Sequence, residues 1–158
     1  MIIALATNNM KAFTPLVKWK DRNTLPNLKF PGVYAIARSE HDITGEAFSW
    51  RPEIIYIGMT NSRGGLRSRL RQFERTIIGK SGHGGAHRVR FKYPDYNTLV
   101  PTLYVSVRPY KCDVRSNMPS DLREMGAVAK FEYDCFARFV EEFNRLPEFN
   151  DKERSPKK

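Results

Sequence analysis

Apolar and polar positions alternate along the chain in blocks that predict elements in the order β-β-α-β-α. Short runs rich in β-branched and aromatic residues predict strands at 33–37, 53–58 and 102–107. The segment 38–52 between the first two strands is polar and contains Gly45. This composition predicts a long hairpin loop or a small insertion.

Two helices follow from periodic apolar positions. The first has apolar residues at the spacing i, i+4, i+7 and i+11, which is one face of a helix: Leu66, Leu70, Phe73 and Ile77. A turn at 61–65 precedes it, with Asn61 or Ser62 as the N-cap, and the glycine-rich segment 81–85 is expected to break it. The second helix is predicted at 121–144, and Pro147 ends it.

The remaining segments lie at the two ends of the chain. Residues 1–28 predict no clear element, because Pro15 and Pro26 break any long helix. We expect them to form an N-terminal extension packed on a domain at 29–151, with a charged tail at 152–158. A length of 158 residues is typical of one domain with a hydrophobic core.

The composition adds a strong charge imbalance. Lys and Arg number 27 against 17 Asp and Glu, which gives a net charge of +10. Such an excess favours a polyanionic partner, most simply nucleic acid. An anionic membrane surface is the competing interpretation, but the sequence has no basic amphipathic helix with an aromatic face and no stretch as long as a membrane span.

The cysteines and the first residues indicate the compartment. Cys112 and Cys135 have no partner at metal-site spacing, which argues against a zinc module and gives no disulfide framework. The apolar run at 1–6 is too short for the core of a signal peptide and lacks a basic start. We therefore expect a soluble protein of the reducing cytoplasm, with no membrane partner.

The second helix carries a carboxylate on its apolar face. Glu132 falls at the centre of this face in a helical projection, and a carboxylate turned toward a core is costly unless a cation or donors meet it. One interpretation is an edge glutamate paired with an arginine or lysine. The other is a ligand of a divalent cation such as Mg²⁺, which takes one or two carboxylates together with substrate phosphate oxygens. Glu124 lies near the edge of the face and is the weaker candidate.

The first helix concentrates positive charge instead. Arg69 lies closest to the apolar stripe, and a partly sheltered guanidinium near a helix start suits bidentate contact with a phosphate. Arg67 and Arg71 point further out, as backbone contacts or as solvated surface, and Arg63 lies in the turn just before the helix. His83 and His87 flank two glycines in the next segment, which is either a plain loop or one whose imidazoles contact a phosphate or assist proton transfer.

Two tripeptides complete the pattern. Gly32-Val33-Tyr34 and Tyr56-Ile57-Gly58 place a hydroxyl at the rim of a sheet beside a glycine that allows close approach. Together with Leu66-x-x-Arg69, Glu132 and Pro147-x-x-Asn150, they resemble the motifs of the GIY-YIG nuclease family across 30–150. The resemblance implies an α+β fold with a small three-stranded antiparallel sheet flanked by helices. It also implies phosphodiester cleavage with one divalent metal ion.

Carried over by position, the resemblance gives each residue a role. Tyr34, Tyr56, Arg69 and Glu132 would be catalytic, with Tyr34 favoured over Tyr56 for activating the attacking water. Arg69 would hold the scissile phosphate, and Glu132 would bind the metal ion, Mg²⁺ or Mn²⁺. Asn150 would support the site from the end of the chain. The expected substrate-binding set is Gly58, Thr60, Arg63, Arg67, Arg71, His83, His87 and Asn150.

The expected function is that of a stand-alone, metal-dependent endonuclease of restriction or mobile-element type, acting on double-stranded DNA as a monomer or homodimer. Two positions depart from the family, since Met59 stands where many members have lysine and Phe73 where some have tyrosine. The segment 38–52 also separates the tripeptides more than is usual. The first two departures favour the alternative of a weakly active or inactive nucleic-acid-binding domain on the same scaffold. A basic protein-interaction module is the third possibility.

Overall fold

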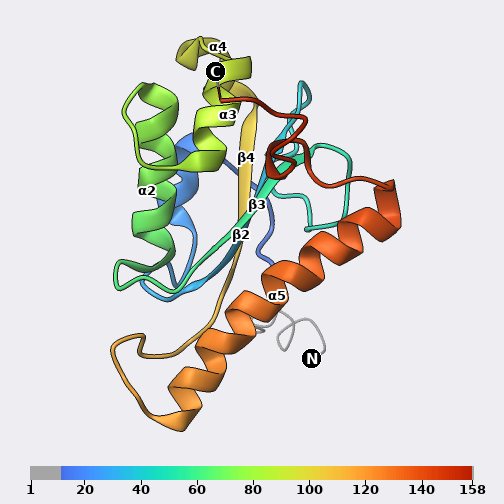
Figure 1. Ribbon diagram of the computed structural model, residues 1–158. Helices are drawn as coiled ribbons and strands as arrows, with labels where there is room; N and C mark the ends of the chain where they lie inside the picture. Colours follow the sequence, from blue (N-terminus) through green and yellow to red (C-terminus); the bar gives the residue numbers. More distant parts are fainter. Residues whose placement is uncertain (1–11, 158) are drawn as a thin grey trace.

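The computed structural model describes residues 12–157 and shows a mixed α+β fold built on one antiparallel sheet (Figure 1). In this range the sheet has four strands in the order β1-β4-β2-β3. The strands are β1 (Val17–Lys18), β2 (Gly32–Arg38), β3 (Ile54–Thr60) and β4 (Leu103–Pro109). The α+β class is confirmed, and the expectation of three strands is wrong because the short β1 pairs with the outer side of β4.

The helices cover both faces of this sheet. The α-helices are α2 (Gly65–Ile78), α3 (Gly84–Lys92), α4 (Tyr96–Leu99) and α5 (Pro119–Phe143). Short 3-10 helices are η1 (Trp19–Thr24), η2 (Val100–Thr102) and η3 (Glu148–Asn150). The sequence predicted α2 and α5, whereas α3 begins inside the segment 81–85 that was expected only to break a helix. Within 12–157, no helix is both long and apolar enough to cross a membrane.

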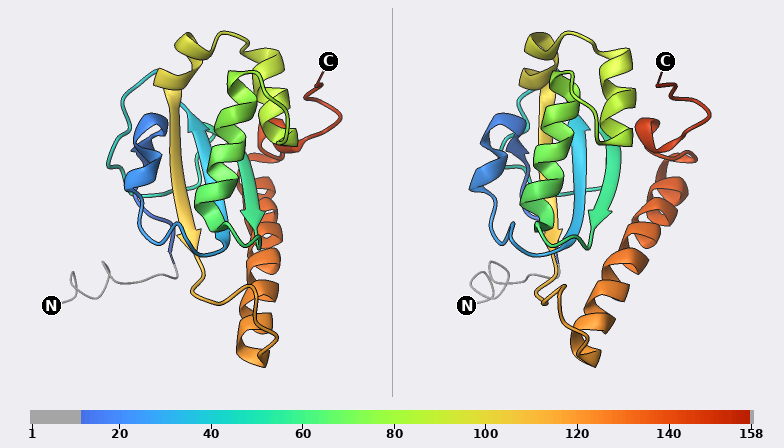
Figure 2. Two further views of the ribbon diagram at one scale, coloured as in Figure 1. Left: turned by 90° about the vertical axis from the view of Figure 1, so that its left-hand side faces the viewer. Right: turned by 60° about the vertical axis from the view of Figure 1, so that its left-hand side comes forward.

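The sheet lies between two helical layers, as Figures 1 and 2 show: α2 and α3 lie on one face, and α5 crosses the other face near β3. Alternation along β2 divides its side chains between the layers, with Tyr34 and Ile36 toward α2 and Val33 and Ala35 toward α5. Because helices cover both faces, β2 is buried almost throughout its length.

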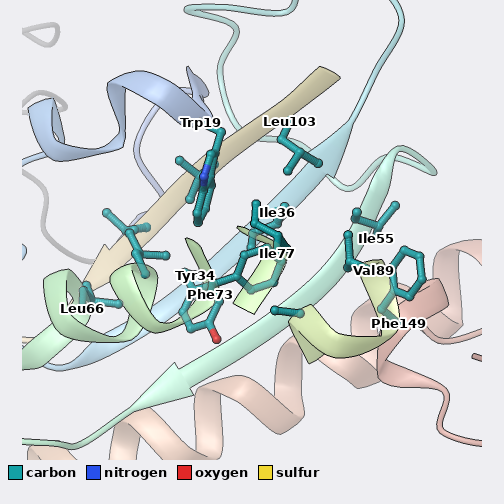
Figure 3. Packing of buried hydrophobic residues seen from close by; sticks show 14 of the residues in the cluster. Trp19, Tyr34, Ile36, Ile55, Leu66, Phe73, Ile77, Val89, Leu103 and Phe149 are labelled. Carbon is teal, nitrogen blue, oxygen red and sulfur yellow. The ribbon is translucent and has the colours of Figure 1, made fainter. Parts of the chain in front are cut away.

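The segment before β2 contributes to the core on the α2 face. Trp19 is fully buried and packs on Phe73, with ring centroids 5.2 Å apart (Figure 3). The buried carboxylate of Glu74 on α2 accepts hydrogen bonds from the Trp19 indole and the Tyr96 hydroxyl, so one side chain joins η1, α2 and α4. Residues 1–11 of the expected N-terminal extension, and Lys158 of the tail, lie outside the described residues.

The edge strand β3 is held in register from both sides. Its pairing with β2 places Tyr34 opposite Gly58 and Ile36 opposite Tyr56, and a register shift follows between Ile36 and Ala37. On its open side, the Ile57 N–H donates to Asn150 Oδ1 at 2.9 Å, and Asn150 Nδ2 donates to the Ile57 carbonyl at 2.8 Å. Asn150 therefore continues the hydrogen-bonding pattern of the sheet in place of a fifth strand.

Candidate active site

Two tyrosines stand side by side on the α2 face of the sheet. The Tyr34 and Tyr56 ring centroids are 6.0 Å apart. Tyr34 is fully buried, and Tyr56 is partly exposed. The Tyr34 ring lies directly over Gly58, where an added Cβ would come within 2.5 Å of the phenol oxygen. Glycine is thus required at 58 for the close approach of the ring to β3.

His83 provides the partner of the buried phenol. Its side chain is fully buried just before α3, and its Nε2 lies 2.7 Å from the Tyr34 hydroxyl. Its Nδ1 accepts a hydrogen bond from the Ala86 N–H at 3.2 Å and caps the helix. Gly85 lets α3 come close, because a Cβ there would lie 2.3 Å from the Tyr56 ring. His87, one turn further on, is only partly buried.

Arg69 reaches the phenols from α2. It is half-buried, and its Nη1 donates to Gln72 Oε1 at 2.8 Å. Its Nε is buried without a hydrogen-bond partner in the part of the chain that the structure describes. A guanidinium with an unused inward-facing N–H is suited to an anion that brings its own acceptors.

Glu132 reaches the same region from α5. It lies in the line of α5 residues whose other members, Val128, Cys135 and Phe139, are buried, and it is itself half-buried. Burial raises the pKa of the Glu132 carboxyl above its usual value, and the positive charge of Arg69 opposes this rise. Among residues 12–157, no cationic side chain forms an ion pair with Glu132. Glu132 thus has no direct ion pair in this range, and Arg69 acts on it only through its charge.

These side chains influence one another electrostatically. Burial raises the pKa of the Tyr34 phenol well above its usual value; the neighbouring Tyr56 adds to the rise, and Arg69 opposes it. Burial likewise raises the pKa of Tyr56, where Arg69 opposes the rise and Glu132 adds to it. Arg69 of α2 and Glu132 of α5 thus both act on the two phenols, Tyr34 and Tyr56. Residues far apart in the sequence thus act on one another in the fold.

The remaining predicted residues lie around this cluster or support it. The Thr60 hydroxyl donates to Ser62 Oγ at 2.9 Å and shapes the turn that leads into α2. Arg63, Arg67 and Arg71 are exposed along this turn and α2, where a polyanion can reach them. The side-chain amide of Asn150 is hydrogen-bonded through both its oxygen and its nitrogen to the backbone of Ile57 in β3.

Two further residues belong to the site. The charge of Arg88 on α3 acts on Tyr56 and on His83, and its Nε is buried without a partner among the described residues. Phe73 packs against His83, with ring centroids 5.0 Å apart, and against Tyr56 at 6.1 Å. The sequence shows Arg88 close to His83 along the chain, but its electrostatic effect on Tyr56 depends on the position of α3.

The donor set limits which metal ion could bind. In the described portion of the chain, no three His, Cys, Asp or Glu side chains are grouped as metal ligands. The half-buried, unpaired Glu132 fits an ion such as Mg²⁺, which takes one protein carboxylate and completes its shell with water and substrate phosphate oxygens. It does not fit a metal such as zinc, which needs several protein ligands.

Comparison of the chain with protein-family models, with curated proteins and with solved structures gives no match.

Proposed function

We propose that the protein is a metal-dependent endonuclease that hydrolyses phosphodiester bonds of double-stranded DNA. The observation that carries the proposal is the position of Glu132. It is half-buried on α5 with no ion pair among residues 12–157, Arg69 acts on its carboxyl, and its own charge acts on the phenols of Tyr34 and Tyr56. Hydrolysis of a phosphodiester needs an oriented water, a Lewis acid and cationic donors near the oxygens that gain charge, and these side chains are suited to all three tasks.

Each side chain has a distinct role in this proposal. Arg69 binds the non-bridging oxygens of the scissile phosphate and stabilises the charge that develops on them. Glu132 holds the ion, and a bound Mg²⁺ or Mn²⁺ supplies Lewis-acid stabilisation to the phosphate. Tyr56 orients the attacking water through its hydroxyl oxygen.

The assignment of Tyr56 departs from the expectation that the sequence favoured. Tyr34 is fully buried and bonded to His83, so it has no surface at which a water or a phosphate could meet it. Tyr56 is partly exposed and lies next to it. We therefore give the contact with the reacting water to Tyr56 and treat Tyr34 as the support behind it.

The charge of the molecule supports DNA as the substrate. A net charge of +10 attracts a polyanion of any sequence, and Arg63, Arg67 and Arg71 extend the positive charge beyond the site. Contacts of this kind position a duplex by its phosphates without reading its bases. The motifs that resemble those of GIY-YIG nucleases support the same activity.

Nicking of a supercoiled plasmid by the purified protein tests this function. We expect nicked and linear products with Mg²⁺ and none when EDTA replaces it. A protein that binds the plasmid in a salt-dependent way but leaves it intact at all Mg²⁺ and Mn²⁺ concentrations would instead be the inactive nucleic-acid-binding domain. Failure to bind DNA at low salt would contradict both functions and leave the protein-interaction module.

A further inference from the structure

The hydrogen bonds of His83 determine which of its ring nitrogens carries the proton. A neutral imidazole has one N–H and one bare nitrogen. Nδ1 accepts the Ala86 N–H at 3.2 Å, so Nδ1 is the bare nitrogen and the proton is on Nε2. Nε2 is the atom that lies 2.7 Å from the Tyr34 hydroxyl. The direction of this second bond is thereby fixed, because Nε2 can only donate to the Tyr34 oxygen.

The surroundings of His83 keep the ring neutral. It is fully buried, and Tyr56 and Phe73 pack edge-on against its ring, with centroids 5.4 Å and 5.0 Å away. The titratable and charged groups that act on it are all basic: Arg69 from α2, and His87 and Arg88 from α3. Burial first, and these basic groups second, lower the pKa of His83 to about 3, so an imidazolium does not compete near neutral pH.

The direction of this bond determines where the proton of Tyr34 points. His83 cannot accept that proton, and Arg69 has only donors. Two groups that can accept a hydrogen bond, the Tyr56 oxygen and the Glu132 carboxylate, carry charges that raise the pKa of Tyr34, and the Tyr56 ring centroid lies 6.0 Å from that of Tyr34. Figure 3 shows the Tyr34 ring among apolar side chains with its hydroxyl turned away from them. With His83 as the donor of their shared bond, the hydrogen of the Tyr34 hydroxyl is left to point away from the core, toward Tyr56 and Glu132.

We propose that His83 is a positioning residue held as the Nε2–H tautomer by the Ala86 amide, and that it directs the hydroxyl hydrogen of Tyr34 toward Tyr56. The role of this hydrogen-bond chain (Ala86 to His83 to Tyr34 to Tyr56) in turnover rests on the proposed nuclease function, with Tyr56 as the phenol that meets the reacting water. The direction of the hydrogen bonds does not depend on that function. The buried position of Tyr34 then has a second role, because Tyr34 links the buried His83 to the partly exposed Tyr56.

Two substitutions of His83 separate its role as the cap of α3 from its role as the donor to Tyr34. His83→Asn keeps an oxygen near the Nδ1 position, which can accept the Ala86 N–H, but removes the donor to Tyr34. His83→Gln keeps an amide N–H near the Nε2 position but loses the cap. If His83 served only the fold, the asparagine variant would be the better enzyme. If the donor to Tyr34 matters for turnover, the order is reversed. The turnover number of His83→Asn should then fall by about a hundredfold, as for a misplaced reacting group, and that of His83→Gln should be largely retained.

The test combines long-range ¹H–¹⁵N spectra of the imidazole at neutral pH with plasmid nicking by both variants under saturating DNA. We expect a protonated Nε2, a bare Nδ1 and faster turnover by His83→Gln than by His83→Asn. A protonated Nδ1, or an imidazolium, would contradict the proposed hydrogen bond from His83 Nε2–H to Tyr34, whatever the activities of the variants are. A protonated Nε2 with His83→Asn equal to or faster than His83→Gln overturns the positioning role. If the wild-type protein nicks nothing, the nuclease function fails, while the imidazole spectrum still decides the direction of the chain.

Discussion

At the scale of single residues, the site depends on polar groups held where packing would favour apolar ones. Glu132 occupies a place in the buried line of α5, and His83 is fully buried before α3. The sequence shows the first of these, because helical periodicity puts Glu132 on an apolar face. It does not show the second, because His83 meets Tyr34 across 49 residues, through the packing of Gly85 on Tyr56.

Burial of a neutral His83 makes the stability of the fold depend on pH. In the unfolded chain this imidazole binds a proton below about pH 6.5, whereas in the fold its pKa is lowered to about 3. Since the unfolded state binds more protons in this window, stability falls as the pH is lowered through it. Relative to His83→Gln, the wild-type free energy of unfolding should fall by about 1.4 kcal/mol per pH unit between about pH 6 and pH 4. Urea unfolding of both proteins measures this difference, and parallel pH profiles would contradict the buried neutral state.

At the scale of elements, the sequence predicted what local patterns determine. The runs of β2, β3 and β4 and the periodic faces of α2 and α5 were visible. The strand β1 was not visible, because two residues carry no period and its pairing with β4 is long-range. Helix α3 opens with Gly84 and Gly85, which alone indicate a loop, and it becomes a helix because His83 caps it and Val89 is buried against the core.

The attachment of η3 to β3 is an element-scale feature with a direct test. Asn150→Ala removes both hydrogen bonds to Ile57 and leaves the N–H and carbonyl of an edge strand without partners. We expect a loss of about 1–3 kcal/mol in the free energy of unfolding. We also expect faster hydrogen exchange at the Ile57 amide.

Asn150→Asp is the matched variant, because its carboxylate still accepts the Ile57 N–H but cannot donate to the carbonyl. Its exchange at the Ile57 amide should stay closer to that of the wild type than the exchange of Asn150→Ala. Equal protection of this amide in all three proteins would show that η3 does not hold β3.

At the scale of the whole molecule, the feature that favours the proposed DNA partner is charge more than shape. The positive excess is spread over the surface, and exposed arginines of α2 lie on the helix that carries Arg69. A duplex held by its phosphates loses affinity as salt rises, with a slope that reports the number of contacts. The fold alone would not indicate this partner, since the same architecture serves unrelated functions.

Arg71→Ala tests whether α2 lies against the DNA backbone. Removal of one phosphate contact should weaken binding to any sequence and reduce the slope of log K against log salt by about 1. Lys130→Ala is the control, because Lys130 is exposed on α5 and pairs with Asp134 at 2.9 Å. Fluorescence anisotropy of a labelled duplex at several salt concentrations gives both slopes. An unchanged slope for Arg71→Ala, or an equal change for Lys130→Ala, would place the DNA elsewhere.

The central claim concerns the inward carboxylate of α5, and Mg²⁺-dependent nicking by Glu132→Gln measures it most directly. The substitution keeps the shape of the side chain and removes its charge, while Glu142→Gln makes the same change at an exposed position of the same helix. We predict that Glu132→Gln remains folded and binds plasmid DNA but nicks none of it, and that Glu142→Gln nicks as the wild type does. Wild-type rates of nicking by Glu132→Gln would contradict the account.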